Sequence, residues 1–349
     1  MATTEGYTNV TLSAGGGAGG GGGSGLNITA LSITQATLLG ICSLMIVISN
    51  TFILVILYKV KNCFEDMQQF AFKALAVTDF LTGIFCCGLT IIAIIYGAGQ
   101  PFSSVMCAIR GAACTGLTNL SALLIACACF DRFVAVIFPL RYFNLVTMKR
   151  ARIVLLVVCT IAASNGALSL LRGRTVAKNN LCLSDFSSER LAFRPSLVTS
   201  LLIFSTTLLL TSISNIKVML VASGQSKRSA NVAPSDITNE SDTTQKNAIQ
   251  TRRGSLKALR VLIVTTIAFF IAIFPWSIVS GSQFSQKTSI ATPMARYVSS
   301  LLLMSNSWVN ALIFATFNKR FRKAAKRVVF RAQLDGESTI LEHTLTSDA

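Results

Sequence analysis

The chain has 349 residues, of which 52% are hydrophobic and only 13% are charged. Soluble globular domains carry about 25% charged residues, so this composition excludes an ordinary soluble protein and favours a membrane protein. The net charge of +17 does not indicate nucleic-acid binding, because the basic residues lie between long apolar runs and form no basic face with interleaved aromatics.

The first 32 residues have the composition of a flexible segment. They contain the Gly-rich stretch AGGGAGGGGGSG (14–25), which cannot pack a core. Asn9-Val-Thr and Asn27-Ile-Thr fit the N-glycosylation pattern, although such triplets also arise by chance. No basic segment with a short apolar run and a cleavage site precedes the first long apolar run, so we expect that run to act as its own signal anchor.

Seven apolar runs are long enough to cross a membrane, because a spanning helix needs ~20 mostly apolar residues. The runs lie at 33–58, 74–95, 111–130, 153–171, 195–216, 261–280 and 297–317. Asp79 is the one charged residue in these runs. The sequence therefore predicts an all-α membrane protein, a seven-transmembrane helix bundle over residues 33–316.

The distribution of positive charge predicts the orientation. Most of the 31 Lys and Arg residues lie in the segments that face the cytoplasm if the N-terminus is outside. Basic residues accumulate on the cytoplasmic side of membrane proteins. We therefore expect a multi-pass plasma-membrane protein whose N-terminal segment 1–32 is extracellular.

Two inner segments differ in character. Residues 222–255 are rich in Ser, Thr, Asn and Gln, which predicts a disordered loop. In the tail, 317–349, the run FNKRFRKAAKRVVF predicts a short amphipathic eighth helix at the membrane interface, in contact with lipids. Its apolar face would consist of Phe317, Phe321, Ala324 and Val328.

The positions of the cysteines and of the single histidine do not predict a zinc site. Most of the ten Cys lie inside apolar runs, where Cys acts as a small hydrophobe. No CxxC pair recurs at ligand spacing, and the single His is His343.

Six motifs occur in a fixed order along the spans and carry a family resemblance. They are Asn50; LAVTD ending at Asp79; Cys107; Asp131-Arg132-Phe133 followed by PLRY; Phe274-Pro275; and NSWVNALIF at 306–314. With them, the chain resembles a rhodopsin-like (class A) G-protein-coupled receptor over residues 35–330. A fainter likeness is to prostanoid and lysolipid receptors.

The resemblance implies a receptor without enzymatic activity. It would couple an extracellular ligand to a heterotrimeric G protein by outward movement of the sixth helix, with arrestin and receptor kinases as further partners. It also implies a Cys107–Cys182 disulfide in the oxidising exterior, the alternative being two free thiols. The implied activation switch comprises Asp131, Arg132, Phe133, Pro139, Pro275, Asn310 and Phe314.

Asp79 is the expected centre of a polar core. Ionisable groups inside a span are costly and usually functional. The resemblance implies that this acid can hold an allosteric Na⁺, and the oxygen-bearing companions suit a hard cation. The alternative is a protonated Asp79 without sodium. The expected companions are Asn50, Ser121, Asn306, Ser307 and Asn310.

Three departures from the family pattern leave a second function open. Ala311 replaces a proline and Phe314 a tyrosine in the seventh span, and Ile273 stands where a tryptophan is usual. These changes favour, as an alternative, a non-signalling seven-helix decoy or scaffold. A transporter is disfavoured, because the chain has one intramembrane acid and no repeated broken helices.

The ligand site is expected near the outer end of the third span. Arg110, one turn below Cys107, suggests an acidic lipid or another anionic small molecule. The basic residues Arg172, Arg174 and Lys178 lie nearby in the outer loop. The alternative is that Arg110 and these residues are solvated loop charges. Cys114, Ile273 and Trp276 would complete the site.

The inner loop before the sixth span suggests regulation. Arg252-Arg253-Gly-Ser255 fits a pattern of basophilic kinases, although such motifs also arise by chance. Many family members restrain the arginine that corresponds to Arg132 with an acid at the base of the sixth helix, where this chain reads Arg253-Gly-Ser255-Leu-Lys257. We therefore expect a weak restraint and noticeable basal activity; phosphorylated Ser255 could supply the missing anion.

Overall fold

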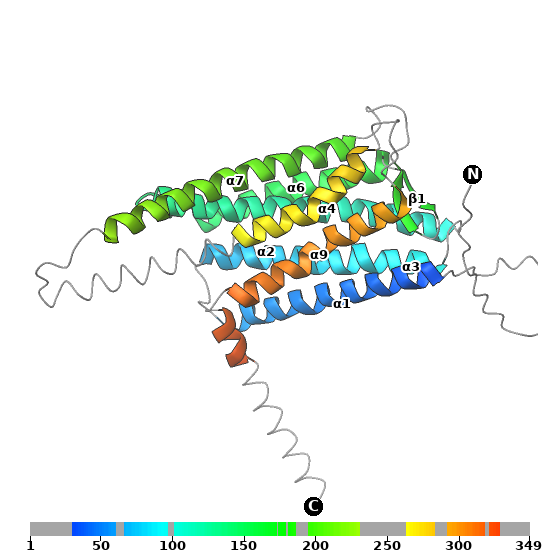
Figure 1. The fold of residues 1–349 in the computed structure, drawn as a ribbon, viewed down its shortest axis with the longest axis horizontal. Helices are drawn as coiled ribbons and strands as arrows, with labels where there is room; N and C mark the ends of the chain where they lie inside the picture. Colours follow the sequence, from blue (N-terminus) through cyan, green and yellow to red (C-terminus); the bar gives the residue numbers. More distant parts are fainter. Residues whose placement is uncertain are drawn as a thin grey trace, which may run out of the picture.

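The computed structural model describes residues 30–60, 66–96, 101–172, 174–178, 181–185, 195–230, 263–282, 292–317 and 321–328. Long helices run side by side along one axis, and the described chain begins at one end of this bundle (Figure 1). We call that end, which also carries a β-hairpin, the outer end, and the opposite end the inner end.

The elements follow one another in the expected order. The first half contains α1 (Ala30–Lys59), α2 (Asp66–Thr82), the π-helix η1 (Gly83–Gly88), α3 (Leu89–Tyr96), α4 (Pro101–Ile137) and the short α5 (Tyr142–Leu145). The second half contains α6 (Met148–Arg172), β1 (Arg174–Lys178), β2 (Leu181–Asp185), α7 (Pro195–Ala230), a helix over Ile263–Ser282, α9 (Pro293–Phe317) and a helix over 321–328.

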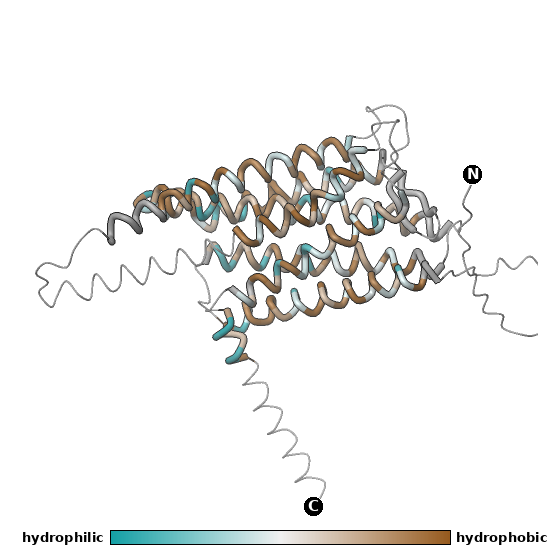
Figure 2. The backbone as a smooth tube through the Cα atoms, viewed as in Figure 1, coloured by the Kyte–Doolittle hydropathy of each residue, from teal (hydrophilic) through white to brown (hydrophobic). Residues whose placement is uncertain are grey.

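The bundle is apolar toward its surroundings and buries polar groups within an apolar core. Six of the described helical segments are long and apolar enough to span a membrane, and α9 is the seventh long helix, packed against α1 and α2. Large apolar side chains such as Ile48 and Leu209 are exposed, whereas Asn50, Asp79 and Asn119 are buried. Apolar residues cover the helices and polar ones gather at the inner end (Figure 2). This arrangement suits lipid, and it confirms the predicted seven-helix bundle.

The π-helix η1 interrupts the second span, which the sequence did not indicate. At its start Gly83 lies against α1: a Cβ there would be 2.9 Å from Cγ2 of Ile46. The carbonyl of Gly83 accepts a hydrogen bond of 2.9 Å from the Ser43 hydroxyl. Because a π-turn disturbs the regular helical ladder, this outside donor stabilises the irregular backbone.

Helices α4 and α6 approach each other closely through small residues. A Cβ on Gly166 would lie 2.8 Å from the Ala112 carbonyl oxygen, and one on Gly116 would lie 3.3 Å from that of Ala162. Small residues permit such backbone contact between membrane helices.

Two further elements refine the expected architecture. An antiparallel hairpin of β1 and β2 packs on α4, so the outer loop after α6 adds strands to an otherwise helical fold. The helix α7 runs to Ala230, so residues 222–230 of the predicted disordered loop are helical.

The helix over 321–328 is amphipathic, as the sequence predicted. Phe321 and Ala324 are buried against the bundle, while Arg322 and Lys323 are exposed. Phe317 lies outside the residues whose side chains are described.

Candidate functional site

Asp79 lies at the centre of a polar cluster between three helices. Its side chain is fully buried in α2. One carboxylate oxygen accepts hydrogen bonds from Ser307 of α9 at 2.9 Å and from Ser121 of α4 at 3.4 Å. The other accepts from the amide of Asn310 at 3.3 Å. All three donors are neutral, so these hydrogen bonds leave the charge of a buried carboxylate uncompensated.

The amides around Asp79 leave acceptor oxygens available. Asn50 donates to the carbonyls of Ile46 at 2.9 Å and Ser307 at 3.2 Å, which ties α1 to α9. The Oδ1 atoms of Asn306 and Asn310 are buried and have no hydrogen-bond partner in the described part of the chain. Carboxylate, hydroxyl and amide oxygens in one cluster form a donor set that suits a hard cation.

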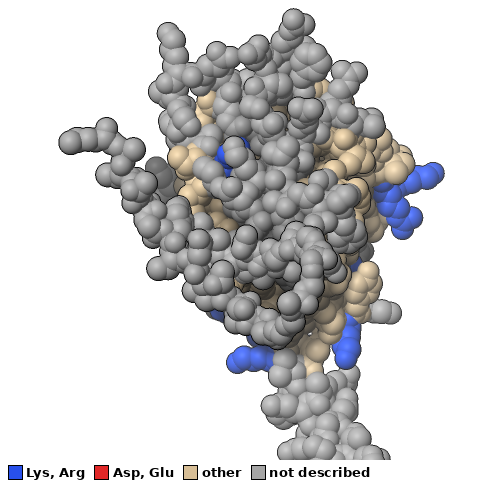
Figure 3. Space-filling view, turned by 90° about the vertical axis from the view of Figure 1, so that its right-hand side faces the viewer, with Lys and Arg blue, Asp and Glu red and all other residues tan. Residues whose placement is uncertain are grey.

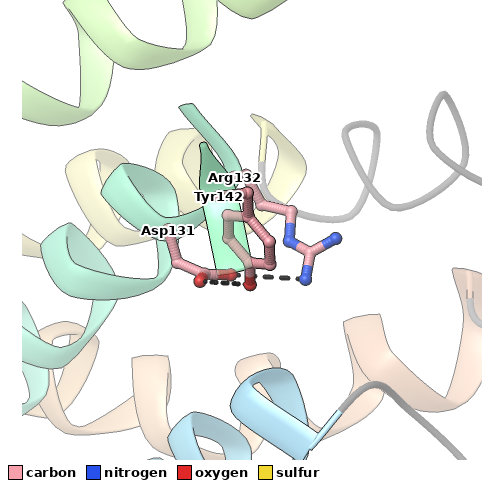
Figure 4. A network of polar contacts seen from close by, with 3 residues as sticks. All are labelled: Asp131, Arg132 and Tyr142. Carbon is pink, nitrogen blue, oxygen red and sulfur yellow. Dashed lines mark hydrogen bonds and ion pairs between the residues drawn. The ribbon is translucent and has the colours of Figure 1, made fainter. Parts of the chain in front are cut away.

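The inner end of α4 carries a second polar group (Figure 4). Tyr142 of α5 donates a 2.9 Å hydrogen bond to Oδ1 of Asp131, and Nη2 of Arg132 lies 3.3 Å from Oδ2 of the same carboxylate. The side chains of Arg132 and Asp131 are 13% and 18% exposed. Asp131 therefore holds both Arg132 and the loop after α4.

The segment after this group is apolar and exposed. Phe133 stacks on Phe130 with ring centroids 6.0 Å apart and contacts Phe138 edge-on at 6.5 Å. Helix α4 ends at Ile137, and Pro139 follows among exposed residues. Leu140 is 95% exposed at this inner end.

A third polar group joins the Ile263–Ser282 helix to its neighbours. Asn215 of α7 donates to the Thr266 hydroxyl at 3.2 Å, and the Cys129 thiol of α4 lies 3.7 Å from the same oxygen. Cys129 precedes Arg132 by almost one helical turn. Sequence reasoning missed this contact, although Asn215 and Thr266 are polar residues in apolar runs.

Of the switch residues predicted in the last two long helices, Asn310 is buried and Pro275 is half-buried. Ile273 is buried, and Trp276 contacts Phe204 of α7 edge-on with centroids 5.9 Å apart. Pro275 lies between them. Helix α9 continues through Ala311, which is buried, because alanine keeps the backbone donor that proline would remove. The side chain of Phe314 lies outside the described residues.

The predicted ligand residues do not form one cluster. Arg110 is buried in α4, and Cys114 follows it by one turn and packs with the apolar group around Cys42 and Cys86. Ile273 and Trp276 belong to the larger core toward α7. Arg110 is thus an interior residue, unlike a solvated loop charge.

The outer end is only partly described. Cys107 is disulfide-bonded, and β2, which contains Cys182, packs against α4. The side chain of Cys182 is not described, so the pairing stays a prediction. Figure 3 shows this end: the visible Lys and Arg side chains stand mostly near the margin of the described atoms, with no described Asp or Glu in view.

One buried cluster was not predicted at all. Asn119 of α4 and Asn165 of α6 both donate to the Ser200 hydroxyl of α7, at 3.1 and 2.9 Å. Two amides inside apolar runs were the sequence signal for it. The close approach of α4 and α6 brings them together.

Several predicted sites fall outside the described residues. These are the glycosylation sites Asn9 and Asn27 and the phosphorylation site Ser255; of the basic residues Arg172, Arg174 and Lys178 at the outer end only the backbone is described.

The fold and these polar groups define a class of protein: a multi-pass seven-helix membrane protein with the architecture of rhodopsin. The crystal structure of squid rhodopsin superposes with a TM-score of 0.75 at 15% sequence identity, covering 87% of this chain and 86% of that one. The sequence model of the family described as 7 transmembrane receptor (rhodopsin family) matches residues 49–314. The chain belongs to this receptor family.

Two relatives are receptors that the chain matches over two thirds or more of their length. Galanin receptor 2b of Danio rerio is 24% identical over 311 residues, which cover 85% of this chain and 75% of that one. Neuropeptide FF receptor 2 of Rattus norvegicus is 23% identical over 297 residues, covering 79% and 67%.

Proposed function

We propose that this chain is a signalling receptor that couples an extracellular ligand to a heterotrimeric G protein. The observation that carries the proposal is the Asp131–Arg132–Tyr142 group at the inner end of α4. It places a restrained guanidinium at the same end of the bundle as an exposed apolar residue, Leu140. A cation and an apolar anchor on one end of the molecule suit the docking of a protein partner.

The mechanism is a population shift. Ligand would bind better to a state in which the inner end of the Ile263–Ser282 helix moves outward, away from α4 and α7. Arg132 would then leave Asp131 and meet the G protein. The Thr266 contacts join these helices in the described state, so they are the contacts that such a movement would break.

The experiment is nucleotide exchange by purified G proteins with the receptor in lipid nanodiscs. We expect basal or ligand-driven exchange in the wild type and loss of at least tenfold in Arg132→Ala at equal receptor concentration, since the proposed contact of the guanidinium with the G protein is removed. Arg322→Ala, an exposed residue of the same charge, serves as the control. If no G protein responds to the wild type under any ligand, the decoy or scaffold function replaces this one.

The ligand that we propose is a peptide with an acidic group. One relative is named as a receptor for neuropeptide FF and the other for galanin. Arg110, buried toward the outer end, supplies a cation that can pair with a carboxylate. An acidic lipid or small molecule would use the same residue, and a screen containing both classes separates them.

The polar core supports a proposed allosteric sodium ion. Asp79, Ser121, Ser307, Asn306 and Asn310 would hold it, because their oxygens include two buried acceptors without a hydrogen-bond partner among the described residues. The ion would offset the buried charge of Asp79 and favour the state in which α2, α4 and α9 are drawn together.

The remaining proposals concern place and partners. We infer a plasma-membrane protein with its N-terminus outside, a Cys107–Cys182 bridge, and arrestin and receptor kinases acting on the inner loop and tail. The charge distribution supports the orientation.

A further inference from the structure

The guanidinium group of Arg132 has a second neighbour, on α2. When the amide oxygen of Gln68 faces it, that oxygen lies 2.6 Å from Nη2, 2.8 Å from Nε and 2.9 Å from Nη1. The opposite amide orientation would set N–H donors against N–H donors, which is repulsive, so the oxygen faces the arginine.

The same amide oxygen is within hydrogen-bond distance of all three guanidinium nitrogens, whereas Asp131 approaches Nη2. Arg132 is therefore held between a carboxylate of its own helix and a neutral amide of α2. Its side chain is only 13% exposed, so little water competes with these contacts.

Neither Asp131 nor Gln68 belongs to the Ile263–Ser282 helix. The sequence from 251 to 282 contains no Asp or Glu, so that helix and the segment before it offer no carboxylate to the arginine. Outward movement of that helix would therefore leave the contacts with Asp131 and Gln68 intact, and Arg132 must separately turn away from α2.

We propose that Gln68 is a positioning residue that holds Arg132 in the non-signalling orientation and sets the basal activity, in place of an acid on the sixth long helix. The inference rests on the proposed G-protein coupling. Because the restraining group is a neutral amide, the hold is weaker than an ion pair, and a carboxylate at the same place would strengthen it.

The first test measures basal nucleotide exchange in nanodiscs. We expect Gln68→Ala to raise it about tenfold, the factor that loss of a hydrogen bond to a charged group gives, and Gln68→Glu to lower it. The matched control is Gln69→Ala, which removes an amide that donates to the Leu57 carbonyl at 2.7 Å and joins α2 to α1 without touching Arg132 in any described contact. Gln69→Ala should leave basal exchange unchanged.

Two outcomes overturn the proposal: basal exchange equal in Gln68→Ala and wild type, or an equal rise in Gln69→Ala, which would indicate general loosening of α2. In an Arg132→Lys background Gln68→Ala should have a smaller effect, because lysine lacks the three guanidinium nitrogens that contact the Gln68 oxygen. An undiminished effect there also counts against it.

A second measurement does not depend on a G protein. In receptor labelled with ¹⁵N-arginine, the Nε–H resonance of Arg132, assigned by its loss in Arg132→Lys, should shift in Gln68→Ala and not in Gln69→Ala. If this resonance shifts in Gln68→Ala while no G protein responds to any variant, Gln68 contacts Arg132 but the proposed G-protein coupling fails. An unshifted resonance in Gln68→Ala refutes the contact between Gln68 and Arg132.

Discussion

The buried carboxylate of Asp79 is the residue whose environment most constrains what the protein can do. It accepts hydrogen bonds from Ser121, Ser307 and Asn310, all of them neutral. Hydrogen bonds from neutral donors lower the cost of burying a charge but do not cancel it, so a proton or a cation must accompany the carboxylate. Which of the two is present decides whether sodium regulates the receptor.

The first prediction separates these alternatives. Thermal unfolding of the purified receptor should shift upward by several degrees when choline chloride is replaced by NaCl at constant ionic strength, because a ligand bound only by the folded state stabilises it. Asp79→Asn should remove the shift, since the amide keeps the size and loses the charge. A sodium shift that persists in Asp79→Asn would place the ion elsewhere, and no shift in the wild type would leave a protonated Asp79.

At the scale of elements, the contact between α4 and α6 also determines where polar residues of these helices meet α7. Gly116 and Gly166 permit backbone contact. Asn119 and Asn165 lie beside these glycines, and both reach Ser200 of α7 from there. The glycines thus determine where a buried polar junction of three helices forms.

The second prediction concerns that contact. Gly166→Ala puts a Cβ 2.8 Å from a backbone oxygen that cannot rotate away, and such overpacking costs about 1–3 kcal/mol. Gly40→Ala in α1 meets nothing within 4 Å and should be neutral or stabilising by up to about 1 kcal/mol, the helix propensity of alanine over glycine. Unfolding temperatures of both variants in the same detergent check this; equal temperatures would contradict it.

The helices and the polar core could be predicted from the sequence, whereas the contacts between particular helix faces could not. The seven spans followed from hydrophobic length, and the residues around Asp79 followed from a family resemblance; the structure brings Asp79 together with Ser121, Ser307 and Asn310. The contact of Gln68 with Arg132 and the junction at Ser200 could not be predicted, because both depend on which faces of neighbouring helices meet. Hydrophobic periodicity is weak in a membrane helix that is apolar on nearly every side.

At the scale of the whole molecule, the proposed mechanism requires that α4, α7 and the Ile263–Ser282 helix separate at the inner end. Thr266 is where all three meet, through Asn215 and Cys129. This group therefore restrains the helix itself, whereas Asp131 and Gln68 restrain only the arginine. Under the proposed mechanism, loosening either of these two restraints would raise basal activity by a different route.

The last prediction tests the restraint on the helix. Thr266→Val keeps the shape of the side chain and removes the hydroxyl, so the closed state loses contacts worth about 1 kcal/mol and basal nucleotide exchange should rise roughly fivefold. Spin labels at the inner ends of α6 and the Ile263–Ser282 helix should report a larger population at long distance. The neighbouring Thr265 offers a close control, because its buried hydroxyl has no hydrogen-bond partner in the described part of the structure. Thr265→Val should change neither measurement, and an equal response of both variants would show that the loss of any hydroxyl in this helix, not the Thr266 contact, opens the receptor.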